Sequence, residues 1–306
     1  MKAKLFGLLP RARWIPHDIP SQEQHAHVRK SRNPFSSSSK AASSNASLRP
    51  RKSTLSLTSE PDPELDARTR LQAQSMFFAR LPLEIRKMVY EYVMGEETVH
   101  LTMGSKKRFG HFVCEDEEKG RDCGCRVLVG GKEGERLSSA GVRMLRTCRR
   151  MYSEAVPHLY RPHTFSLLHI THLLYLPTFL PQPRLNTIRT LRLRWAIRAL
   201  PYLRRGPAQR LAYREDTNNW ERGWSIIASM TGLRDLYVVI TDPSPQGMWE
   251  RNWLELEEVL LRPVKAVIRP RWFELVLPYE SCKMDWDMAE SSCVLRTPET
   301  LVEEED

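Results

Sequence analysis

The stretch IRTLRLRW, residues 188–195, decides the fold class of this chain. From Leu191 on, its apolar residues Leu191, Leu193 and Trp195 occupy every second position, which is the period of a β-strand with one buried face. Arg192 and Arg194 fall between them, so guanidinium groups line the opposite face. Three further apolar segments have the length and composition of strands, namely Thr164–Leu168, Leu233–Ile240 and Trp272–Leu277.

Helical patterns separate these strands, near Ile170–Phe179, Trp220–Met230 and Trp253–Ile268. Strands that alternate with helices favour right-handed βα units and a parallel sheet. The pattern W-E-R-x-W occurs at 220–224 and again at 249–253, and we interpret its tryptophans as anchors that pack helix on sheet. The expected fold class is α/β or α+β, with irregular strand–helix units like leucine-rich repeats over residues 163–280 and a mainly parallel sheet.

Residues 81–93, LPLEIRKMVYEYV, have the pattern of an amphipathic helix instead. Pro82 suits the first helical position, and Gly95 is placed to end the helix. The apolar residues that fall on one face of this helix are Leu81, Ile85, Met88, Val89 and Tyr92. A polar, glycine-rich insert follows at about 100–140. A second helical pattern then runs over 142–159, where Pro157 should kink or split the helix.

The segments FARLPLEIRKMVY, 78–90, and LRTCRRMYSEA, 145–155, resemble two blocks of a large family of fungal proteins with an F-box-like domain of unknown function. In that family the blocks precede strand–helix repeats, and the resemblance covers residues 76–278. It implies an F-box-like helical module at 71–162 that docks a Skp-type adaptor of cullin ubiquitin ligases, while the repeats hold a substrate. The implied docking residues are Leu81, Pro82, Ile85, Met88 and Val89. A compact F-box runs its helices nearly end to end, whereas a long insert separates the two blocks here.

The net charge of +10 is unevenly distributed. Residues 1–70 form a basic, serine-rich stretch that we expect to be disordered, and residues 281–306 form an expected acidic tail. The segment 184–214 is rich in arginine, and its candidate anion contacts are Arg189, Arg192, Arg194, Arg198, Arg204 and Arg205. These side chains could grip nucleic-acid phosphates, or they could pair with the acidic C-terminal third of the chain. The second interpretation is favoured because the two opposite charges nearly cancel.

The densest set of possible metal ligands lies in the insert, in the pattern H-x2-C-x8-C-x-C: His111, Cys114, Cys123 and Cys125. Three thiolates and an imidazole could hold a structural zinc ion tetrahedrally. The spacing matches no common zinc finger or ribbon, so a reduced surface loop is the favoured interpretation and no cofactor is expected.

Signatures of catalysis are missing from the sequence. The segment Gly130–Glu133 fails the phosphate-loop pattern, and no G-x-S-x-G or G-x-G-x-x-G motif occurs. Six cysteines in 306 residues favour a reducing compartment, and no apolar run is long enough to cross a bilayer. We expect an intracellular protein, cytoplasmic or nuclear, although the Arg- and Ser-rich N-terminus leaves mitochondrial import open. The expected function is a non-enzymatic protein-interaction scaffold, with an F-box-like substrate adaptor as its specific form and a nucleic-acid-associated protein as the alternative.

Overall fold

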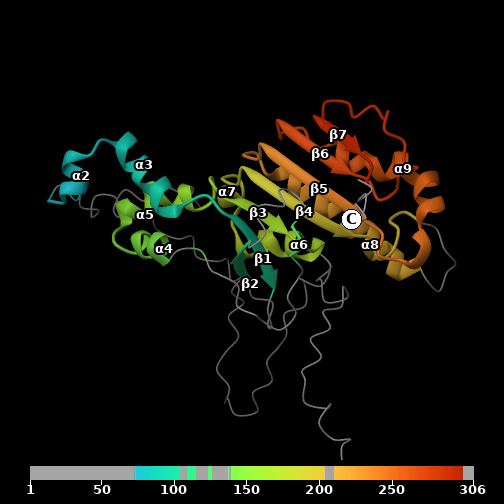
Figure 1. Ribbon diagram of the computed structural model, residues 1–306, viewed down its shortest axis with the longest axis horizontal. Coiled ribbons are helices and arrows are strands. Elements are labelled where there is room, and N and C mark those ends of the chain that lie inside the picture. Colours follow the sequence, from blue (N-terminus) through green and yellow to red (C-terminus); the bar gives the residue numbers. More distant parts are fainter. Residues whose placement is uncertain are drawn as a thin grey trace, which may run out of the picture.

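A computed structural model describes residues 72, 74–103, 109–114, 123–125, 137, 139–203 and 210–298. Over these residues the chain is a mixed α/β protein with one seven-stranded, mostly parallel sheet (Figure 1). The predicted α/β fold class with a mainly parallel sheet is therefore confirmed. The expected tail at 1–70 lies outside the described residues.

The strands lie side by side in the order β2-β1-β3-β4-β5-β6-β7. Their bounds are β1 Thr98–Met103, β2 Phe109–Val113, β3 Thr164–Leu167, β4 Thr190–Ala196, β5 Asp235–Thr241, β6 Trp272–Val276 and β7 Cys293–Arg296. Every neighbouring pair is parallel except β1 and β2, which form an antiparallel pair at one edge. Strands β3 to β7 have the same order in the chain and in the sheet. Because the crossover connections between parallel strands are right-handed, the helices in these connections lie on one face of the sheet.

Three long helices form that covering layer (Figure 1), and they are α6 Ile170–Phe179, α8 Arg210–Ser229 and α9 Glu250–Lys265. The short helix α7, Gln182–Leu185, precedes β4. Trp220, Trp224 and Trp253 are fully buried between the helices and the sheet. The indole N–H of Trp220 donates to the backbone carbonyl of Leu260 at 3.1 Å. The tryptophans of the W-E-R-x-W pattern therefore act as packing anchors, as predicted.

The opposite face of the sheet carries both polar and apolar side chains. Leu191 and Leu193 of β4 are buried under the helices, whereas Arg192 and Arg194 are half-buried on the other side. Trp272 on β6 is exposed on that second face. In the part of the chain that the structure describes, no helix covers this side of the sheet (Figure 1).

A group of short helices lies beyond the β2–β1–β3 end of the sheet (Figure 1): α2 Met76–Arg80, α3 Leu83–Met94, α4 Ser139–Leu145 and α5 Arg149–Ala155. Gly95 ends α3 as expected, with a φ of +72° that favours glycine and its N–H donating to the Glu91 carbonyl. The helical pattern expected over 142–159 splits at Pro157 as predicted, because α5 ends at Ala155 and Pro157 lies in a separate 3-10 turn, Val156–Leu159. A second break, which the sequence did not predict, lies at residues 146–148, where extended Cys148 caps α5.

Two regions contain strands that the sequence did not predict. The insert expected at about 100–140 contributes most of β1 and all of β2, and β1 pairs with β3. The segment expected as an acidic tail, 281–306, contains β7, which pairs with β6. These strands are only four to six residues long, so their formation depends on pairing with neighbouring strands and not on a local sequence pattern.

No helix of the described residues has the length and apolar character that a bilayer crossing requires.

Candidate functional site

A buried ion pair joins the two sequence blocks 78–90 and 145–155. The Arg86 guanidinium on α3 makes two bonds to the Glu154 carboxylate on α5, with Nε–Oε2 at 2.8 Å and Nη2–Oε1 at 3.1 Å. The Tyr90 hydroxyl donates to the same carboxylate at 2.8 Å, and Arg150 donates to it at 3.0 Å. Burial alone would raise the pKa of Glu154, but these hydrogen bonds hold that pKa below its usual value.

The ion pair fixes which face of α3 points outward. Arg86 and Tyr90 are buried, so the side chains on the other side of the helix face solvent. Ile85 is 42% exposed, Met88 is 63% exposed and Tyr92 is 89% exposed. Of the other residues predicted for docking, Pro82 is exposed, whereas Leu81 and Val89 are half-buried. The helix therefore carries the apolar stripe expected from the sequence, and most side chains of this stripe are exposed to solvent.

Three of the four predicted arginines within the described residues bind different parts of the chain. Arg189 donates to the Gly232 carbonyl at 2.6 Å, and Arg198 lies 3.3 Å from the ring nitrogen Nε2 of His169. Arg194 donates to two loop carbonyls, those of Cys123 at 3.0 Å and Cys125 at 3.4 Å. Arg192 is half-buried beside it on β4. Arg204 and Arg205 lie outside the described residues.

The structure brings together three of the four predicted metal ligands and replaces the fourth. The ligand atoms of His100, Cys114, Cys123 and Cys125 all lie within 4.8 Å of one another. His111 is exposed on β2, where it pairs with Leu101 of β1. Side chains alternate along a strand, so His111 points to the opposite face of the β1–β2 pair from Cys114. The prediction of His111 is therefore wrong, and His100 on β1 takes its place.

Strand register and one arginine build this cluster. His100 pairs with Phe112, which places Cys114 diagonally across from His100 on the same face of the hairpin. The Cys114 N–H donates to the Thr98 carbonyl at 2.8 Å and so ties Cys114 to β1. Arg194, reaching from β4, holds the backbone of the Cys-x-Cys segment over the sheet. No sequence motif signalled His100, because it lies in a strand before the cysteine-containing insert.

The protonation states of the cluster follow from its surroundings. Burial lowers the pKa of His100 to about 4, and the positive charges of Arg194 and Arg192 add to that effect, so the imidazole is neutral near pH 7. Burial raises the pKa of Cys125 to about 12, with the neighbouring thiols of Cys114 and Cys123 acting in the same direction. None of the six cysteines forms a disulfide, so the sulfur atoms of this group are thiols that could act as ligands.

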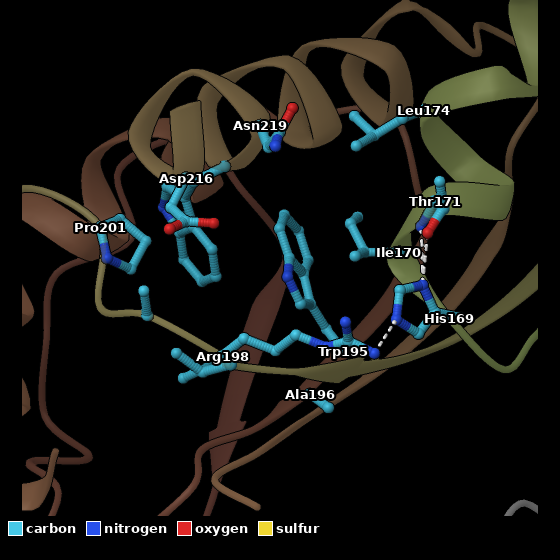
Figure 2. A pocket seen from close by; sticks show the side chains of 13 residues that line it. His169, Ile170, Thr171, Leu174, Trp195, Ala196, Arg198, Pro201, Asp216 and Asn219 are labelled. Carbon is cyan, nitrogen blue, oxygen red and sulfur yellow. Dashed lines mark hydrogen bonds between the residues drawn. The ribbon is translucent and has the colours of Figure 1, made fainter. Parts of the chain in front are cut away.

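A small cavity of about 50 Å³ lies beyond the carboxyl end of β4, between α6 and α8 (Figure 2). A space of this size holds a few water molecules. His169, Arg198 and Asp216 lie on its wall around the Trp195 indole. The Nδ1 atom of His169 accepts from the Thr171 N–H and caps α6, while Arg198 approaches Nε2. Burial lowers the pKa of His169 to about 4, which suits a capping role for a neutral ring.

Comparison with known proteins gives one match. No curated protein and no solved structure matches the chain at a significant level. The family model for a domain of unknown function, DUF7730, matches residues 70–298, from just before α2 to just after β7. The match takes in the ion pair between α3 and α5, the cysteine–histidine cluster and the whole sheet, and the chain therefore belongs to the DUF7730 family.

Proposed function

We propose that this protein is a non-enzymatic interaction scaffold, in which the outer face of α3 docks one protein and the strand–helix region holds another. The observation that carries the proposal is the exposed apolar stripe of α3. Ile85, Met88 and Tyr92 are spaced i, i+3 and i+7, so they form one continuous stripe along the helix. Exposed apolar residues gathered on one helix face are typical of surfaces that bind a partner.

The inner side of α3 supports this assignment. The bonds from Arg86 and Tyr90 to Glu154 hold the helix at a fixed rotation, so the stripe faces outward before any partner arrives. A surface that is already ordered loses less conformational entropy on binding than one that must be ordered by its partner. The long insert does not separate the helices, because α3 packs against both α4 and α5.

The specific partner that we propose is a Skp-type adaptor of a cullin ubiquitin ligase. The proposal draws on the resemblance of residues 78–90 to the opening of an F-box, whose helices bind that adaptor. Ile85 and Met88 would then be buried in the complex. The sequential parallel strands with helices on one face are similar to a short leucine-rich-repeat arc, and the face that carries no helix in the described residues is the proposed site for a substrate.

The test is a binding titration of the full-length chain with a purified Skp-type adaptor. We expect measurable affinity for the unmodified chain, and a loss of about tenfold or more in the double variant Ile85→Asp/Met88→Asp, because both anchors would bring a charge into an apolar contact. The matched control is Met248→Asp/Ile268→Asp. Met248 and Ile268 are 60% and 45% exposed, close to the values for Met88 and Ile85, and they lie beside α9. Absence of binding at tens of micromolar, or an equal loss in both double variants, would overturn the proposal.

A second candidate function is nucleic-acid association through residues 184–214. Arg192 and Arg194 project from the sheet face that carries no helix in the described residues, and this observation favours it. The hydrogen bonds of Arg194 to loop carbonyls weigh against it. Salt-sensitive binding of generic RNA or duplex DNA would support the candidate, and no binding at low salt would exclude it.

A further inference from the structure

We infer that His100, Cys114, Cys123 and Cys125 form a structural zinc site that fastens residues 123–125 to the β1–β2 hairpin. Zinc is the metal that this donor set fits best, because three soft thiolates and one imidazole are its common structural ligands. Nothing in the scaffold proposal requires the ion, and the site lies on the sheet and not on the docking face of α3.

Two of the distances within the cluster match the edges of a zinc tetrahedron, and all four ligand atoms lie within 4.8 Å of one another. With Zn–S bonds of about 2.3 Å and a Zn–N bond of about 2.05 Å, tetrahedral geometry separates two sulfurs by about 3.8 Å and a sulfur from a nitrogen by about 3.6 Å. In the structure the Cys114 and Cys125 sulfurs are 3.8 Å apart. The Cys123 sulfur lies 3.5 Å from Nε2 of His100. The group therefore has two edges of a metal-binding tetrahedron already in place.

The surroundings are those of a closed, structural centre. His100, Cys114 and Cys123 are buried and Cys125 is half-buried, so the four ligands leave little access for a substrate or water. The Phe112 ring lies against the His100 imidazole, with the ring centroids 4.8 Å apart. Apolar cover of this kind limits solvent at a metal and favours a structural role.

Charge also favours the assignment. Metal binding would release the three thiol protons to solvent, so Zn²⁺ with three thiolates and one neutral imidazole would have a net charge of −1. Arg194 bonds to the backbone of the Cys-x-Cys segment and so sits beside that charge. Arg194 is a positioning residue, because its hydrogen bonds end on the backbone carbonyls of Cys123 and Cys125 and not on their sulfur atoms.

The test is metal analysis of the full-length chain purified without a polyhistidine tag. We expect about one zinc per chain, which is the stoichiometry of a single four-ligand site. His100→Ala and Cys125→Ser should lose most of the metal. The matched controls are His111→Ala, on the other face of the same hairpin, and Cys282→Ser, a buried cysteine outside the cluster; both should keep it.

A second measurement keeps the test independent of how well the variants fold. Cobalt(II) added to the chelator-stripped wild-type chain should give thiolate-to-cobalt charge-transfer absorption and the intense visible bands of tetrahedral coordination. Zinc should then displace the cobalt and remove both signals. A wild-type chain that binds neither metal, that carries iron in place of zinc, or that loses zinc equally in His100→Ala and His111→Ala would overturn the inference.

Discussion

Glu154→Gln should be among the most damaging single substitutions in the helical group, because it leaves a buried cation without its counter-charge. The side chains of Arg86 and Glu154 are only 6% and 15% exposed. Glutamine keeps the shape of glutamate but offers one acceptor oxygen in place of two. Four hydrogen bonds from Arg86, Tyr90 and Arg150 now end on that carboxylate, and an amide cannot accept all of them.

The expected cost is about 3–5 kcal/mol of unfolding free energy, the range for breaking one side of a buried ion pair. The matched control is Glu255→Gln, which removes an exposed i,i+4 pair with Arg251 at 3.3 Å. The side chains of that pair are 91% and 60% exposed, so its loss should cost less than about 0.5 kcal/mol.

Urea unfolding followed by circular dichroism measures both costs. Tryptophan fluorescence gives a second reading from the sheet, because the segment 71–162 contains no tryptophan. The pKa of Glu154 is held below its usual value, so its contribution is complete above the ordinary glutamate pKa of about 4.3 and disappears as the pH falls through the lowered value. The difference between wild type and Glu154→Gln should therefore shrink below about pH 4. A loss under about 1 kcal/mol at pH 7, or one equal to that of Glu255→Gln, would refute the reasoning.

Three more outcomes follow from single contacts. Gly232→Ala should cost about 1–3 kcal/mol or more in thermal unfolding, because its Cβ would lie 1.7 Å from the backbone carbonyl oxygen of Asn186. Arg194→Met should weaken zinc binding by about 10- to 100-fold in a competition titration while the tryptophan emission stays that of the native sheet. Glu257→Gln should cost about 1–3 kcal/mol, because the two oxygens of the buried carboxylate accept the Lys283 N–H at 3.3 Å and the Trp286 indole N–H at 3.2 Å, and the amide NH₂ would face one of these donors; faster proteolysis of the segment 279–292 would accompany it.

Much of the sheet could be predicted from sequence because its signals are local. The alternation in 188–195 and the apolar run at 233–240 specify strands without reference to the rest of the chain. The strands β1, β2 and β7 carry no such signal. Residues 98–103, TVHLTM, are mixed in polarity, and they form a strand because β3 on one side and β2 on the other offer hydrogen-bonding partners.

The candidate sites were harder to predict, because each depends on contacts between distant parts of the chain. Arg86 is separated from Glu154 by 68 residues, so a helical wheel of 81–93 alone places its charge on the solvent side. His100 was missed for a similar reason. Its pairing with the cysteines is set by the register of β1 against β2 and by Arg194 from a third strand, and none of these is visible in a ligand-spacing pattern.

The two proposed sites meet at one short piece of backbone. Helix α3 ends at Gly95 and β1 begins at Thr98, so the docking stripe and His100 belong to consecutive elements. The Glu97 N–H donates to Nδ1 of His163, and the Thr164 N–H donates to the Glu97 carbonyl, which fixes this connection against β3. A metal at His100 would restrain β1 from its other side. Because only residues 95–97 join α3 to β1, the zinc site and the ion pair together would hold the docking stripe at a set angle to the sheet, and this order would lower the entropy cost of binding without being needed for it.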